Sequence, residues 1–369
     1  MIGFSGPTLA DRLTAAANRP AGFDYLRLLL ASGVIVTHSF MLTLADVSRG
    51  RPLIAIILPM FFALSGFLVC GSLMRCRTLV DFLALRILRL LPALAVETLL
   101  SAVLIGAIFT TLPLKAYFTD PMFRGYFTSI IGMVKYKLPG VFTTNPWPGF
   151  VNAQLWTLKF ELACYVLLAV AVLLGLVRRS RRFAVFILIA MLFVFARDGF
   201  LRSAPAAVSV PGSVLVLSFL LGVAAYLYRE RIVWSGRLFA VALATTLVCL
   251  SVPMGDFVVA VPATYVTVYL GLLNPGRISL VAKGDYSYGL FLYGYPIQQA
   301  TVAALGEPGR HWSINLAVAY PIAFAVAAFS WWCVERPCLR LKPLVSRVQS
   351  WIMPRPRVAR TISDPQTVE

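Results

Sequence analysis

The sequence predicts an all-α fold, a polytopic bundle of about ten transmembrane helices. Of its 369 residues, 59% are hydrophobic and only 13% are charged, and the mean hydropathy is +0.82. A soluble domain would carry about 25% charged residues. Long apolar runs recur, and a helix needs about 20 such residues to cross a bilayer. We place the spans at residues 24–46, 52–74, 85–112, 152–177, 183–198, 208–228, 237–252, 256–273, 285–304 and 312–334.

The formal net charge of +18 reflects membrane topology and does not indicate nucleic-acid binding. With the N-terminus inside, about 23 basic residues lie on the cytoplasmic side of the spans and about nine lie outside, which is the bias that orients membrane proteins. We therefore expect both termini in the cytoplasm and no nucleic-acid partner. The expected organisation is a cytoplasmic lead (1–22), a transmembrane domain (23–342) and a disordered basic cytoplasmic tail (343–369).

The first span contains Arg27 and His38. Eleven residues at about 100° each bring the two side chains to one helix face, about 16 Å apart along the axis. A histidine inside a membrane is costly to keep and indicates a functional site. The alternative is a structural hydrogen bond between helices. The six cysteines show no metal-ligand spacing and no disulfide framework, so no metal site is expected.

The next two spans contain small and charged residues with two interpretations each. Ser65 and Gly66 indicate either a close contact between helices or a gap beside the first span. Arg86 and Arg89 share a helix face. Such arginines mark the cytoplasmic end of a span, but guanidinium groups also bind phosphate. Glu97, deeper in the third span, needs a partner or a proton.

The largest external loop, residues 113–150, is rich in aromatic residues. These side chains are typical of a membrane-interface belt, and they also suit a surface that stacks against sugar rings. In the fourth span, Glu161 is expected ~13–15 Å below the outer surface, near the depth of His38. A carboxylate that orients an imidazole is a general-base arrangement. Lys159 lies two residues before Glu161 and does not face it.

The later spans differ in polarity. Residues 183–273 are mostly apolar and read as scaffold. The ninth span begins with Ser287 and Tyr288 and is rich in Tyr and Gln, which favours a wet cavity over lipid contact. Pro296 breaks that helix and frees a carbonyl group, which protein or water can satisfy.

Together these stretches resemble the membrane acyltransferase-3 family, bacterial enzymes that modify surface carbohydrates and other acceptors. The stretches that carry the resemblance are, in order, FDYLRLLLASGVIVTHSF, FFALSGFLV, LRILRLLPAL, LWTLKFELACY, DYSYGLFLYGYPIQ and VERPCLRL. They extend from about Phe23 to Lys342, and the pattern is similar to transferases for exopolysaccharide or related glycans. Many family members have histidine at the position of Gly294, so any role of that second histidine is absent or has moved.

The resemblance implies a multi-pass O-acyltransferase of the bacterial cytoplasmic (inner) membrane. The donor would be cytoplasmic acyl-coenzyme A, with acetyl as the expected group and no bound cofactor. The acceptor would be a hydroxyl of a surface or exported glycan or of a lipid-linked saccharide. The implied residues are catalytic His38 and Glu161, coenzyme-binding Arg27, Arg86 and Arg89, and substrate-lining Ser65, Trp156, Lys159, Ser287 and Tyr288.

Two other classes compete with an enzyme. A proton-coupled transporter also uses His, Glu and Lys inside the membrane. Transporters usually show repeats and broken helices in symmetric positions, which this sequence lacks. A non-catalytic assembly subunit would not need polar residues at matching depths. Within the enzyme class, direct transfer and an acyl-histidine intermediate both stay open.

Overall fold

The computed structural model describes residues 6–47, 50–177, 180–199, 210–252 and 255–342. In these residues the chain is helical and forms no β-strand beyond two isolated bridges, Thr8 with Val233 and Thr110 with Val141. The all-α prediction is therefore confirmed for the part of the chain that is described. The predicted tail, 343–369, lies outside it.

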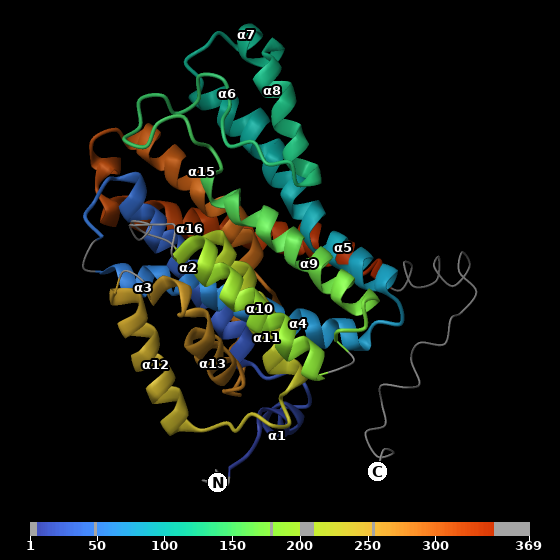
Figure 1. Cartoon of the computed structure of the whole chain (residues 1–369). Coiled ribbons are helices and arrows are strands. Elements are labelled where there is room, and N and C mark those ends of the chain that lie inside the picture. Colours follow the sequence, from blue (N-terminus) through green and yellow to red (C-terminus); the bar gives the residue numbers. More distant parts are fainter. Residues whose placement is uncertain (1–5, 48–49, 178–179, 200–209, 253–254, 343–369) are drawn as a thin grey trace.

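The helices lie in the order shown in Figure 1. Their bounds are α1 Leu9–Ala15, α2 Gly22–Leu42, α3 Arg51–Ala55, α4 Ile57–Arg75, α5 Leu79–Leu99, η2 Leu100–Ile105, α6 Gly106–Phe109, α7 Leu114–Thr119, α8 Pro121–Tyr126, η3 Phe127–Ile131, η4 Ala153–Thr157, α9 Leu158–Leu173, α10 Ser180–Val194, η5 Phe195–Gly199, α11 Gly212–Leu227, α12 Gly236–Ser251, η6 Gly255–Phe257, α13 Ala260–Gly271, α14 Ser279–Lys283, α15 Ser287–Leu305, η7 Pro308–Arg310, α16 Trp312–Ser330, η8 Trp331–Glu335 and α17 Arg336–Leu339.

Every predicted span contains a helix, but the helices differ in length and polarity. Among the described residues, 5 helical stretches are long and apolar enough to cross a membrane: Gly22–Leu42, Arg51–Arg75, Leu79–Phe109, Ala153–Leu173 and Trp312–Leu339. Two shorter apolar helices are Gly212–Leu227 and Gly236–Ser251. These stretches support a membrane protein. Ten spans and cytoplasmic termini stay predictions.

Helix α4 packs most extensively against α11, and glycines make this contact close. A Cβ atom on Gly66 would collide with the carbonyl oxygen of Phe219, and one on Gly222 would collide with that of Ala63. Small residues let helix backbones approach each other inside a membrane. The close-contact interpretation of Gly66 is therefore confirmed. Its neighbour Ser65 lies on a different face of α4 and lines a cavity.

The two ends of the bundle differ, as Figure 1 shows. The segment with α7 and α8 caps one end, and α1 lies at the other. The cap has its own apolar cluster, which includes Tyr117, Tyr126 and Phe142. The Tyr117 hydroxyl donates to the carbonyl oxygen of Ala102 at 2.6 Å, which ties the cap to η2. Helix α15 packs between α2 and α16 and extends towards the cap.

Candidate functional site

A cavity of about 370 Å³ opens among α2, α4, α5, α9 and α15. We call it the basic cavity, because four of its charged lining residues are basic and two are acidic. These residues are Arg27, Arg86, Arg89, Lys342, Glu161 and Asp285. Ser65, Ser287 and Tyr288 also line it. The three predicted coenzyme-binding arginines therefore meet in one space, although they come from α2 and α5.

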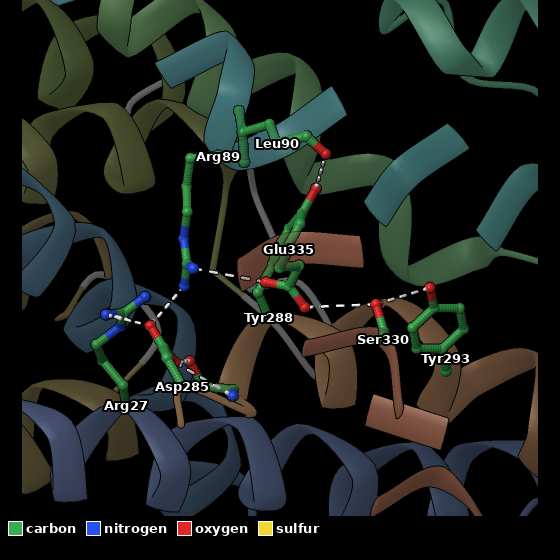
Figure 2. A network of polar contacts seen from close by, with 9 residues as sticks. Arg27, Arg89, Leu90, Asp285, Tyr288, Tyr293, Ser330 and Glu335 are labelled. Carbon is green, nitrogen blue, oxygen red and sulfur yellow. Dashed lines mark hydrogen bonds and ion pairs between the residues drawn. The ribbon is translucent and has the colours of Figure 1, made fainter. Parts of the chain in front are cut away.

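Asp285 joins two of these arginines (Figure 2). Its Oδ2 atom lies 2.7 Å from Arg27 Nη1 and 2.5 Å from Arg89 Nη2. The Ser287 hydroxyl donates to the Oδ1 atom at 2.6 Å. One carboxylate therefore holds both arginines in place.

The network continues away from the basic cavity through Glu335. A carboxylate oxygen of Glu335 lies 3.5 Å from Arg89 Nη1. The Ser330 hydroxyl donates to Glu335 at 3.4 Å, and the Tyr293 hydroxyl donates to Ser330 at 3.1 Å. Glu335 is 2% exposed. Arg89 is thus held between two carboxylates, which neutralise much of its charge.

The charge of Arg86 is less neutralised than that of Arg89. Its Nη2 atom donates to the Ser72 hydroxyl at 3.0 Å, and no carboxylate among the described residues pairs with it. Its Nε atom is buried without a hydrogen-bond partner in that part of the chain. A guanidinium group with spare donors is suited to an anionic ligand such as phosphate.

A second cavity of about 180 Å³ contains His38, and we call it the histidine cavity. The ring of Tyr295 meets the imidazole edge-on, with 5.1 Å between the ring centroids. Trp147, Phe150 and Trp156 form an aromatic wall. His38 is half-buried and lines this cavity, and no hydrogen bond ties its ring nitrogens to another of the described residues.

Gln154 also lines the histidine cavity. Its Nε2 atom donates to the Leu292 carbonyl oxygen at 2.8 Å, which fixes the side chain. Its Oε1 atom is buried and has no partner in the described residues. An unpaired buried acceptor is unfavourable, by about 1–3 kcal/mol, unless a ligand or water donates to it.

The two cavities adjoin. Leu58 from α4, Thr157 from η4 and Phe291 from α15 line both of them. Arginines that could bind an anion therefore lie on one side of this wall, and His38 lies on the other.

Gln299 on α15 fixes the aromatic wall of the histidine cavity. Its Nε2 atom donates to the carbonyl oxygens of Trp147 and Phe150, both at 2.9 Å. Asn145 donates to the Gln299 Oε1 atom at 2.7 Å. A side chain that is 0% exposed thus connects α15 to the loop that contains Trp147 and Phe150.

The predicted site residues are distributed over both cavities, with two departures. Glu161 lines the basic cavity and accepts a hydrogen bond from the Tyr165 hydroxyl at 2.5 Å. No hydrogen bond joins it to His38 in the described residues, because Glu161 lies one helical turn beyond Thr157, on the far side of the wall. The expected support of the imidazole by Glu161 is therefore not a direct contact here, and its catalytic role stays a prediction.

Lys159 is the second departure, since it lines neither cavity. Its side chain is exposed, and its Nζ atom lies 5.0 Å from the centre of the Phe160 ring. Positions two apart on a helix point in different directions, so Lys159 cannot share the face of Thr157 and Glu161. Its expected place on a substrate path is therefore not supported by these two cavities and stays a prediction. Trp156, by contrast, lines the histidine cavity.

Several site residues were not among those predicted. Asp285 and Glu335 could have been found as carboxylates at the ends of spans that need basic partners. Gln154 and Tyr295 are polar residues in apolar segments, which is a similar signal. Phe291 carries no such signal, because an apolar residue in an apolar helix is unremarkable before the cavities are known.

The chain is similar to a protein family and to individual proteins over most of its length. The family described as "Acyltransferase domain" matches residues 21–336. The chain is 31% identical over 361 residues to "Nodulation protein 10" of Rhizobium leguminosarum bv. viciae, which covers 88% of this chain and 95% of that protein. It is 26% identical over 345 residues to an "O-acetyl transferase" of Shigella phage Sf6, which covers 88% and 98%. No solved structure matches the chain.

Proposed function

Because the chain belongs to the acyltransferase family that matches residues 21–336, we propose that it moves an acetyl group from cytoplasmic acetyl-coenzyme A to a hydroxyl of a surface or exported glycan. The family and the long apolar helices make it a membrane acyltransferase. The donor, the glycan acceptor and the bacterial inner membrane are parts of the proposal. The similarity to an O-acetyl transferase supports a hydroxyl as the acceptor.

The contact between the two cavities is the observation that carries the proposal. Coenzyme A has anionic phosphates at one end and a thioester at the other. Phosphates at Arg86 and its neighbours in the basic cavity would direct the pantetheine arm towards the shared wall. The thioester would then meet His38 beyond that wall. The phosphate end of the donor thus matches the arginines, and its thioester end matches His38.

The chemistry at His38 is a direct acyl transfer. An imidazole nitrogen takes the proton of the acceptor hydroxyl, and the oxygen attacks the thioester carbonyl carbon. The carbon–sulfur bond then breaks, and the acceptor is left as an O-acyl ester. The imidazolium returns its proton to the leaving thiolate, so free coenzyme A is released as the thiol. Tyr295 restricts the ring from one side. Glu161 lies across the wall and contributes charge at a distance in this scheme.

The acceptor would enter from the cap end of the histidine cavity. Trp147, Phe150 and Trp156 offer apolar faces to a sugar ring, and the unpaired Oε1 atom of Gln154 offers an acceptor for a sugar hydroxyl. A specific site of this kind combines aromatic walls with a few placed polar groups.

Labelled acyl transfer tests the proposal. Membranes that contain the protein are mixed with acetyl-labelled acetyl-coenzyme A, and label is counted in the polysaccharide fraction. We expect label on the glycan only when the protein is present, with release of free coenzyme thiol. Absence of donor consumption would contradict the proposal and favour the alternative, a proton-coupled transporter.

A further inference from the structure

The wall between the two cavities contains one large side chain, Phe291. Its position follows from the geometry of α15, because residues 288, 291 and 295 lie on one stripe of a helix. Tyr288 lines the basic cavity, Tyr295 lines the histidine cavity, and Phe291 lines both. Leu58 and Thr157 complete the shared wall from α4 and η4.

Hydrogen bonds hold α15 on both sides of this ring. The Tyr288 hydroxyl donates to the Leu90 carbonyl oxygen of α5 at 2.9 Å (Figure 2). Gln154 donates to Leu292 as described, and Gln298 Nε2 donates to the Ile35 carbonyl oxygen of α2 at 2.9 Å. Because the backbone is fixed to three neighbours, the width of the passage depends on the side chains.

The space beyond the wall is small. The histidine cavity, at about 180 Å³, is about half the size of the basic cavity and must hold the acyl group and the acceptor hydroxyl together. Trp156 and Tyr295 line it together with Phe291. Each extra methylene of a longer acyl group would therefore compete with one of these rings for the same volume.

We propose that Phe291, with Leu58 and Thr157, is the gate between the donor and acceptor halves and selects short acyl groups. The inference rests on the proposed function, because it names the donor class that the site accepts. Discrimination by one methylene in a hydrophobic pocket is about 10- to 200-fold. Shortening Phe291 removes the ring that excludes the longer chain, and enlarging it narrows the passage for every donor.

The test compares acetyl-coenzyme A with butyryl-coenzyme A as donors in membranes that contain wild type or Phe291→Ala. Acyl label in the polysaccharide fraction gives kcat/KM for each. We expect the butyryl-to-acetyl ratio of kcat/KM to rise at least about tenfold in Phe291→Ala. In Phe291→Trp, kcat for acetyl transfer should fall. The KM for the donor should change little, because the arginines of the basic cavity are unchanged.

Phe329 provides the matched control. It lies on α16, its side chain is 65% exposed, and it lines neither cavity. Phe329→Ala should keep the wild-type ratio of butyryl to acetyl. If Phe291→Ala fails to accumulate, Phe291→Leu is measured in its place and should give a smaller rise in the same direction.

The outcomes distinguish a failure of the Phe291 gate from a failure of the proposed acetyl transfer. Normal acetyl transfer with an unchanged ratio in Phe291→Ala or Phe291→Leu overturns the gate and leaves the proposed function intact. A wild-type protein that transfers no acetyl group overturns the proposed function itself, and the gate with it. A raised ratio in Phe329→Ala as well would overturn the assignment to Phe291.

Discussion

Arg86 should bind a donor phosphate, and replacing it with alanine tests this assignment. Its guanidinium group lines the basic cavity. Among the residues that the structure describes, it donates only to the neutral Ser72 hydroxyl, and its Nε atom has no partner there. Arg27 and Arg89 are already paired with Asp285. Among these three arginines, Arg86 therefore has the most donor capacity left for an incoming anion.

The size of the effect follows from the lost hydrogen bonds. A hydrogen bond to a charged group contributes about 1.5–3 kcal/mol. Since about 1.4 kcal/mol is a factor of ten, Arg86→Ala should raise the KM for acetyl-coenzyme A by about 10- to 150-fold. Arg86 is half-buried, so solvent screening favours the lower half of this range. The kcat at saturating donor should change little.

Two donors make the assay specific. Acetyl-coenzyme A carries the phosphates, whereas S-acetyl-pantetheine keeps the thioester and lacks the nucleotide. Arg86→Ala should raise KM for the first and leave KM for the second unchanged. Arg75→Ala is the control, because it removes the same charge from the neighbouring helix end at an exposed side chain that lines neither cavity. An equal rise for both donors would refute the phosphate contact.

Three further variants test other parts of the structure. Asp285→Asn leaves two guanidinium groups without their shared carboxylate and should lower stability by about 1–3 kcal/mol. The variant should therefore have a lower thermal midpoint than wild type, because both ion pairs of Asp285 are lost; an unchanged midpoint would contradict this. Gln299→Leu frees the carbonyls of Trp147 and Phe150 and should raise acceptor KM several-fold with donor KM unchanged. Lys159→Gln should leave both KM values within twofold of wild type; a large donor effect would contradict its exposed position.

Relations within one helix could be predicted from the sequence. Helical periodicity places Arg27 and His38 on one face of the first span, and each lines one of the two adjoining cavities. The mismatch of Lys159 with the face of Glu161 follows from the same periodicity. The polar residues of the ninth span likewise indicate a wet cavity from the sequence alone.

Relations between helices could not be predicted in this way. Helical rise placed Glu161 and His38 near one depth, but depth does not fix the rotation of α9 about its axis. That rotation puts Glu161 with Tyr165 and the arginines. Likewise, the spacing of Arg86 and Arg89 predicts that they share a helix face. It does not predict which carboxylates pair with one and not with the other. Asp285 and Glu335 pair with Arg89 only because distant segments meet.

His38→Ala in the labelled-transfer assay tests the central claim most directly. General-base catalysis contributes about 10²- to 10⁴-fold, so transfer of label to glycan should fall by at least about 100-fold. The variant should be inserted normally and should still bind acetyl-coenzyme A, because the basic cavity is unchanged. A His38→Ala protein that transfers acetyl groups at the wild-type rate would contradict the account.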